Sequence, residues 1–274
     1  MTSAQLNSET SFLDGLTDLQ KQWFHDPSPP HLFAVVSWGC AATAWLAKVL
    51  NSHKDIFCVH AANGVWEAFG QASKLDGLEY LRILRVQGRH YAVAGDVHGF
   101  DRKQIAGLKA LLPGMFSSAV LVREPIARLR SQLALFDGMA DQRFWNISYV
   151  DTMIDRLGLV LPNRDYHTKL FIHGACLLNA ITEEAQDGKV FRQEDLTADP
   201  EVLRALIREV TAGKISPATG WCSDALQIRG VNPHDSSRRP LKFEEWQLNV
   251  LRRVVNPEAW KLYADLGYPT PGFL

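Results

Sequence analysis

The sequence lacks the features that would mark a disulfide-stabilised, membrane-spanning or exported protein. Its four cysteines, at positions 40, 58, 176 and 222, show neither the Cys-x-x-Cys spacing of many zinc and redox sites nor a regular framework. No apolar run is long enough to span a bilayer, and residues 1–26 lack the basic and then apolar pattern of a signal peptide. We therefore expect a reduced, cytoplasmic protein without a membrane span.

An excess of charge of one sign is also missing. The chain carries 29 lysine and arginine residues against 30 aspartate and glutamate residues, so its formal net charge is −1. This balance argues against a general polyanion-binding surface, and we expect no nucleic-acid partner. Core-forming residues are plentiful, because 46% of the residues are hydrophobic and eight are tryptophan. A chain of 274 residues with this composition suits one large α/β domain or two small ones.

The stretch 33–50 organises the rest of the chain. Residues 33–36 are apolar and rich in β-branched side chains, which predicts a short buried strand. Residues 37–42 are mostly small, and a helical spacing of apolar residues starts at Thr43. A strand, a small-residue turn and a helix start form an anion site, because the first helical N–H groups lack partners. Ala42 stands where nucleoside triphosphatases have a lysine, so an ordinary turn between strand and helix is the alternative.

Four later runs have the composition of short buried strands. They are residues 56–59, 91–94, 119–122 and 189–192. Helical periodicity separates them, which predicts one doubly wound α/β domain with a mostly parallel sheet over residues 31–274. Residues 1–30 form a lead-in helix or extension, and we expect 137–165 and 211–240 to be irregular.

Several candidate site residues follow the predicted strands or lie in the irregular segments. His60 follows the second strand, where residues of an open α/β sheet face the ligand crevice, so it is a candidate for the acceptor pocket, with a capped or packed histidine as the alternative. His98 lies beside a glycine shortly after the third strand, which suits a general base, although a satisfied loop histidine is the alternative. Trp66, Trp145 and Tyr149 are candidates to line an acceptor pocket, with core packing or a hydrophobic contact surface as the alternative.

Residues 37–46, Ser-Trp-Gly-Cys-Ala-Ala-Thr-Ala-Trp-Leu, resemble the 5′-phosphosulfate loop of the sulfotransferase family, usually written S-Y-P-K-S-G-T-T-W-L. The matching residues are Ser37, Thr43, Trp45 and Leu46. Cys40 departs from the pattern, because the family has a lysine there that shields the leaving phosphate. Loss of one such preorganised donor typically lowers a rate by about 10²–10³.

A second resemblance lies after the fourth predicted strand. Residues 123–131 are similar to the family's 3′-phosphate motif, R-D-P-x-x-R-x-x-S, in which the first arginine and the serine bind the phosphate. These residues are Arg123 and Ser131 here, and an arginine fork with a hydroxyl suits a phosphate. His98 resembles the histidine of the family's K-x-H segment, which takes the acceptor's proton, although Asp96 replaces the lysine.

Two further matches are partial. Gln193 stands where the family often has a tyrosine that touches the adenine. Arg229 resembles part of the R-K-G loop that closes over the 3′-phosphate, and Arg238 or Arg239 could serve instead. A surface loop is the alternative for all three arginines.

The resemblance implies sulfuryl transfer from 3′-phosphoadenosine-5′-phosphosulfate (PAPS) to a hydroxyl or amine, on a sulfotransferase fold related to the P-loop NTPases. The implied sites for PAPS or its product adenosine 3′,5′-bisphosphate are Gly39, Cys40, Ala41, Ala42, Thr43, Ala44, Trp45, Arg123, Ser131, Gln193 and Arg229. His98 is the implied general base, and Trp45 is expected to stack on adenine. The expected acceptor is a small molecule or a glycan, no metal is needed, and a homodimer is compatible with the sequence.

Two other function classes stay open at this point. Cys40 and Ala44 favour a nucleotide-binding protein without turnover on the same fold. A kinase-like P-loop enzyme would bind ATP with Mg²⁺, and Asp96 is its only arguable metal carboxylate after a strand.

Overall fold

The computed structural model describes residues 30–37, 40–61, 77–100, 102–137, 147–186, 188–228, 243–269 and 272. Gly39, Trp66, Trp145 and Arg229 lie outside these ranges, as does nearly all of the lead-in at 1–30, so the expectations for them stay predictions. Within the described ranges, no helix is both long enough and apolar enough to cross a bilayer.

Within the described residues, five parallel strands form one sheet, which confirms the predicted single parallel sheet. The strands are β1 (His31–Val36), β2 (Ile56–His60), β3 (Val93–Val97), β4 (Phe116–Val122) and β5 (Lys189–Arg192). Their order across the sheet is β2-β3-β1-β4-β5, and all neighbouring pairs are parallel. All six residues of β1 are buried, as expected for a central strand with helices on both faces.

The third strand begins and ends later than the sequence suggested. The prediction placed it at 91–94 and took Gly95 and Asp96 as part of the following loop, but both lie within β3. The reason is packing, because a Cβ atom at Gly95 would lie 2.4 Å from the Phe33 ring on β1. Glycine here makes room for an aromatic side chain on the neighbouring strand instead of marking a turn.

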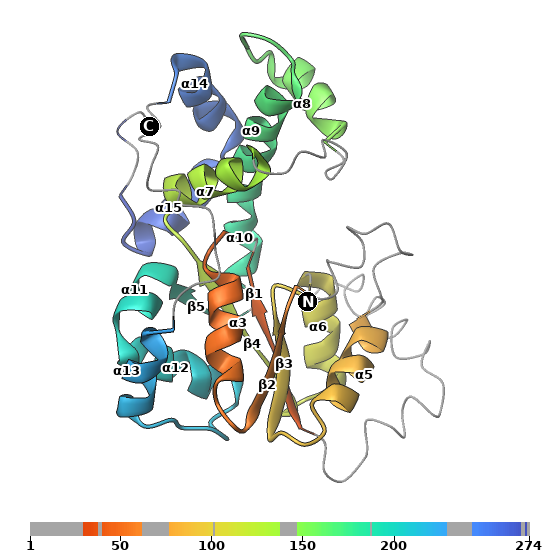
Figure 1. Cartoon of the computed structure of the whole chain (residues 1–274). Helices are drawn as coiled ribbons and strands as arrows, with labels where there is room; N and C mark the ends of the chain where they lie inside the picture. Colours follow the sequence, from red (N-terminus) through yellow and green to blue (C-terminus); the bar gives the residue numbers. More distant parts are fainter. Residues whose placement is uncertain are drawn as a thin grey trace.

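Helices cover both faces of the sheet, which confirms the doubly wound arrangement (Figure 1). One face carries α3 (Thr43–Asn51), α12 (Pro200–Val210) and α13 (Thr219–Leu226), whose buried residues share a core with Phe33 and Val35. The other face carries α5 (Gly77–Gln87) and α6 (Arg102–Leu111), in a second core. The short helix α11 (Gln193–Ala198) follows β5 directly.

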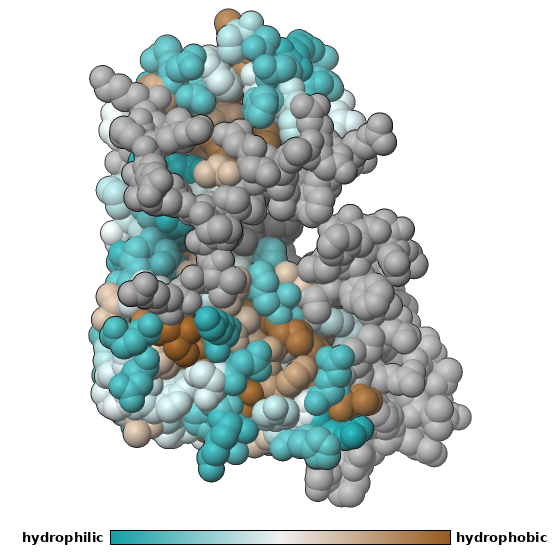
Figure 2. All heavy atoms as spheres, viewed as in Figure 1, coloured by the Kyte–Doolittle hydropathy of each residue, from teal (hydrophilic) through white to brown (hydrophobic). Residues whose placement is uncertain are grey.

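A helical part lies beyond the ends of the strands, at the top of Figure 1. It contains α7 (Pro125–Asp137), α8 (Tyr149–Leu157), α9 (Tyr166–Leu177), α14 (Glu245–Val254) and α15 (Pro257–Asp265). The helical run of α9 continues through η1 (Leu178–Ala180) and α10 (Ile181–Glu184) toward the sheet. Because α7 starts just after β4, this part faces the carboxyl ends of the strands. On the face seen in the same view, Figure 2 shows mainly hydrophilic described residues, with small hydrophobic groups near α3 and β2.

Two helices, α8 and α13, fall in segments that were expected to be irregular. In α8, Val150 and Ile154 lie four residues apart and are both buried, so this helix has an apolar face that the aromatic-rich surroundings obscured. In α13 the buried residues are Cys222 and Ala225. Both are small, so the periodic signal in the sequence is weak.

The strand order places three loops side by side. Strands β2 and β3 lie on one side of β1 within the sheet. After β3 the chain crosses to β4, which lies on the other side of β1. Ligands of open α/β sheets bind outside the carboxyl ends of the strands at such a reversal. The loops there follow β1, β3 and β4, and they contain Cys40, His98 and Arg123.

Candidate functional site

The loop after β1 has the backbone conformation of an anion-binding turn. Cys40 and Ala42 adopt left-handed conformations, with φ of 54° and 58°. Such alternation around a residue without positive φ is typical of nests, in which successive N–H groups point inward. Helix α3 then starts at Thr43 with no side-chain cap, so its first N–H groups lack that partner. Left-handed alanine costs about 1–2 kcal/mol, which the surrounding structure must offset.

Helix α7 brings a cluster of polar residues against this loop. Arg123 follows β4, and its Nη1 atom donates to the Cys40 carbonyl oxygen at 2.9 Å. Ser131 and Arg128, one turn apart on α7, are buried and interact with the Cys40 thiol. The fold therefore brings together four residues that lie up to 91 positions apart in the sequence.

Arg128 is the second arginine of the R-D-P-x-x-R-x-x-S motif, and the sequence analysis gave it no role of its own. Its side chain is 5% exposed, and its Nη2 atom has no hydrogen-bond partner among the residues that the structure describes. Within the described part of the chain, no carboxylate forms an ion pair with it. A buried unpaired guanidinium is strongly unfavourable in water-free surroundings. Such an arrangement is able to hold an anion. In the sequence, the three-residue spacing between Arg128 and Ser131 was the signal for it.

The Cys40 thiol is not an activated nucleophile. Burial raises its pKa, and this effect outweighs the opposite influence of Arg128, Ser131 and Arg123. A thiol at a helix start beside arginines can have a lowered pKa and react readily. Here the thiol stays protonated at neutral pH, so the structure gives no support to a redox-sensitive Cys40.

Two histidines contact the loop from the neighbouring strands. His60 ends β2 and His98 follows β3, and their rings stack with centroids 6.3 Å apart and planes 20° from parallel. The Nε2 atom of His60 lies 2.9 Å from the Thr43 hydroxyl oxygen at the start of α3. The Nδ1–H group of His98 donates to the Ser37 carbonyl oxygen. Since a carbonyl only accepts, Nε2 of a neutral His98 carries the lone pair.

His60 therefore lies closer to the expected phosphate loop than the sequence implied. The sequence argument assigned it to an acceptor pocket, whereas its hydrogen bond ties it to Thr43. His60 is an exposed residue at the end of β2, although its ring packs against His98. Partial loss of water around the ring, and secondly the neighbouring His98, lower the pKa of His60 to about 4. His60 is thus neutral at pH 7 when no anion is bound.

The turn that presents His98 is held by a buried carboxylate. Asp96 is fully buried and accepts a hydrogen bond from the Tyr80 hydroxyl on α5. A Cβ atom at Gly99 would lie 2.3 Å from this carboxylate, so only glycine fits. His98 itself has a φ of 75°. Asp96 consequently lies near the carboxyl end of β3, and its carboxylate is buried away from solvent beneath the turn.

The start of α7 fixes the backbone next to Arg123. The Glu124 carboxylate accepts hydrogen bonds from the Ile126 N–H at 3.1 Å and from the Ala127 N–H. Pro125 is the first helical residue, where a missing N–H leaves nothing unsatisfied. This cap aligns the helix start with the end of β4.

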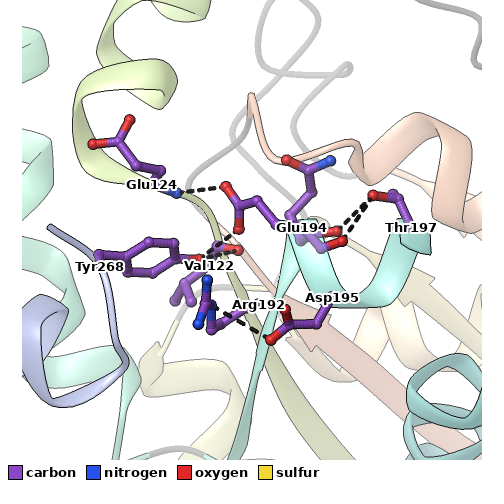
Figure 3. A network of polar contacts seen from close by, with 8 residues as sticks. Val122, Glu124, Arg192, Glu194, Asp195, Thr197 and Tyr268 are labelled. Carbon is purple, nitrogen blue, oxygen red and sulfur yellow. Dashed lines mark hydrogen bonds and ion pairs between the residues drawn. The ribbon is translucent and has the colours of Figure 1, made fainter. Parts of the chain in front are cut away.

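A second network joins this helix start to β5 and the C-terminal segment (Figure 3). Glu194 on α11 accepts from the Glu124 backbone N–H at 2.9 Å and from the Tyr268 hydroxyl at 2.8 Å. The Arg192 guanidinium lies over the Tyr268 ring, 4.6 Å from its centroid. Burial and Glu194 both raise the pKa of Tyr268, so its hydroxyl remains a donor. The Arg123 backbone is thereby tied to segments far along the chain.

Three other predicted site residues have described positions. Trp45 is 7% exposed, and its indole N–H donates to the Ile228 carbonyl oxygen at 2.8 Å. Gln193 is the first residue of α11 and is partly buried. Tyr149 lies on α8, far from the sheet in Figure 1, and its hydroxyl contacts Nδ1 of His173 at 2.6 Å. Adenine stacking by Trp45 and acceptor binding by Tyr149 stay predictions.

The remaining predicted residues of the loop form the start of α3. Ala41 is buried, whereas Ala42 and Ala44 are partly exposed. These residues can contribute only backbone N–H groups. Among the described residues there is no group of three or more histidine, cysteine or carboxylate side chains placed to hold a metal ion.

Comparison with known proteins gives a distant structural likeness. No protein-family model matches the chain, and no curated protein matches it. Among solved structures, the chain is similar to the crystal structure of a sulfotransferase from Alicyclobacillus acidocaldarius. The identity is 15% and the TM-score 0.45, over 89% of this chain and 98% of that chain. Values this low carry no argument about activity, so the function is argued from the residues of the site.

Proposed function

We propose that the chain is a sulfotransferase that moves a sulfuryl group from PAPS to a hydroxyl or amine of a small-molecule or glycan acceptor. The observation that carries the proposal is Arg128, a buried guanidinium without an ion pair among the described residues, beside Arg123 and Ser131. Two guanidinium groups and a hydroxyl are the donors that suit a phosphate.

The residues present fit a nucleotide with phosphates at both ends of its ribose. In the proposal, Arg123, Arg128 and Ser131 hold the 3′-phosphate. Backbone N–H groups at the start of α3 and the Thr43 hydroxyl hold the 5′-phosphate, aided by the helix dipole. Both groups of residues meet at Cys40, whose carbonyl accepts from Arg123.

His98 is proposed as the general base. When bound, PAPS supplies the sulfuryl group. The bond between sulfur and the bridging phosphate oxygen breaks as a bond from the acceptor oxygen or nitrogen to sulfur forms. The leaving group is adenosine 3′,5′-bisphosphate. The Nε2 atom of His98 takes the proton that the acceptor loses. Its Nδ1–H bond to Ser37 orients the ring for this role. The protein otherwise positions the reactants and stabilises charge.

One observation favours a second candidate, a nucleotide-binding protein without turnover. The Cys40 side chain is directed at Ser131 and Arg128 and carries no charge. An enzyme that lacks a cation at the leaving group would be slow, by about 10²–10³ on the usual effect of one such donor.

The test is a transfer assay with sulfur-labelled PAPS and a panel of hydroxylated and amine acceptors, including glycans. We expect labelled product from at least one acceptor class, inhibition by adenosine 3′,5′-bisphosphate, and no effect of a metal chelator. Tight binding of the bisphosphate without transfer to any acceptor would favour the second candidate. Mg²⁺-dependent turnover of ATP with no bisphosphate binding would contradict both.

A further inference from the structure

Among the described residues, no lysine or arginine side chain forms a hydrogen bond with Thr43 at the start of α3, where the 5′-phosphate is proposed to bind. A helix N-terminus contributes only about half an elementary charge. The loop in front of it offers small neutral side chains, and Cys40 is protonated. We infer that His60 takes up a proton when the anionic nucleotide binds, and that the resulting imidazolium supplies this charge. The inference rests on the proposed function, because it concerns the same nucleotide.

The geometry that supports this role is the contact between β2 and α3. The Nε2 atom of His60 lies 2.9 Å from the Thr43 hydroxyl oxygen, and Thr43 is the first residue of α3. A protonated Nε2 donates a hydrogen bond in that direction, whereas a neutral Nε2 either donates or accepts. Among the described residues, His60 is therefore the titratable side chain that forms a hydrogen bond at the start of α3, where the 5′-phosphate is expected.

Anion binding changes the protonation of His60 in a definite direction. The pKa of His60 is about 4 in the free protein, so the ring is neutral at pH 7. A dianion at the start of α3 favours the imidazolium and raises this pKa. Between the free and the bound pKa values, binding takes up a proton, and affinity rises by up to about tenfold for each unit by which the pH falls.

The titratable groups around His60 come from two strands. On β2, Cys58 lies on the same face of the strand, and burial raises the pKa of its thiol. Beside β3, His98 stacks on the His60 ring, and the Asp96 carboxylate lies two residues earlier. Helix α3 contributes the Thr43 hydroxyl and its positive end, which opposes the imidazolium until an anion is bound.

The stacked pair then holds one proton instead of two. Like charges this close disfavour each other, so a proton on His60 disfavours a second one on His98. His98 consequently keeps the lone pair that a general base needs, while His60 carries the charge. Pairs of titratable groups with divided roles of this kind are typical of acid–base sites.

The experiment is calorimetric titration of the full chain with adenosine 3′,5′-bisphosphate at pH 7 in buffers of different ionisation enthalpy, which counts the protons taken up. Wild type is compared with His60→Gln, which keeps a polar group near Thr43 but cannot gain a proton. His53→Gln is the matched control, because His53 lies beyond the other end of α3 and contacts the Trp221 ring edge to face. Subtracting the proton uptake of His60→Gln from that of the other two proteins removes the contribution of the ligand's own phosphates, whose second pKa is about 6.

We expect wild type and His53→Gln to take up about 0.5–1 proton more than His60→Gln, because one group titrates. Between pH 5 and 7 their affinity should also fall more steeply with rising pH. Equal proton uptake in all three proteins, with binding intact, would overturn the role of His60 and leave the proposed function standing. Absence of bisphosphate binding in wild type would overturn both.

Discussion

Replacing Arg128 with methionine is expected to weaken binding of adenosine 3′,5′-bisphosphate by at least about 30-fold, the effect of losing about 2–5 kcal/mol from a buried charged contact. The same variant should unfold at an equal or higher denaturant concentration than wild type when no ligand is present. Binding weakens while stability is kept or gained, because the buried charge of Arg128 favours the bound anion but is unfavourable in the free protein. Arg128 is buried without an ion pair in the described part of the free protein.

The stability effect follows from the chemistry of buried charge. Replacing buried ionic groups with apolar side chains of similar volume is often neutral or stabilising, by about 1–4 kcal/mol. Methionine fills much of the space of an arginine stem without strain, since it is flexible. A structural arginine would behave differently, because its removal would lower stability and affect binding only indirectly.

Arg204→Met is the matched control for this prediction. Arg204 is a partly exposed arginine on α12 that pairs with Glu201 at 3.3 Å. Exposed pairs of this kind contribute about 0–1 kcal/mol, so stability should change little and binding should not change. Bisphosphate titration and urea unfolding of the three proteins provide the measurements. An Arg128→Met protein that binds as tightly as wild type would remove Arg128 from the anion site.

Replacing His98 with asparagine is expected to lower the rate of sulfuryl transfer by about 10²–10⁴, the usual effect of losing a general base. Binding of adenosine 3′,5′-bisphosphate should change little, because His98 is assigned to the acceptor's proton. Asparagine is the suitable replacement since position 98 has a φ of 75°, a conformation that asparagine tolerates better than most residues.

The readouts for His98→Asn are single-turnover transfer from PAPS and bisphosphate titration on the same protein. His90→Asn serves as the control, because His90 is an exposed histidine that follows α5 and contacts Arg89. A transfer rate within about threefold of wild type, well below the loss expected for a general base, would exclude His98 from that role. Loss of bisphosphate binding together with loss of transfer would assign it to nucleotide binding.

The architecture could be predicted from the sequence because its strands are short apolar runs separated by helical periodicity. The predicted strand at 189–192 coincides with β5, and the remaining predicted strands overlap theirs. The boundaries of β3 failed because Gly95 reads as a turn signal, whereas it accommodates the Phe33 ring. The helix α13 escaped notice because small residues fill its buried positions.

The candidate site was only partly predictable. Arg123 and Ser131 stand in a motif whose order and spacing can be read along the chain. The lack of an ion pair to Arg128 in the described part of the chain depends on where the fold places the carboxylates, and no local pattern encodes that. The contact of His60 with Thr43 joins two elements through β2 and α3 packing, which a residue-by-residue argument could not supply. The left-handed conformation of Cys40 and Ala42 was likewise hidden, since neither residue is glycine.

The most direct measurement is a calorimetric titration of the protein with adenosine 3′,5′-bisphosphate, alongside adenosine 5′-monophosphate and ATP with Mg²⁺, repeated on Arg123→Ala. We predict selective binding of the bisphosphate and loss of that selectivity in the variant, because in the proposal Arg123, Arg128 and Ser131 hold the 3′-phosphate. Equal affinity for all three nucleotides, or a bisphosphate affinity that Arg123→Ala leaves unchanged, would contradict the assignment of this site and with it the proposed sulfotransferase activity.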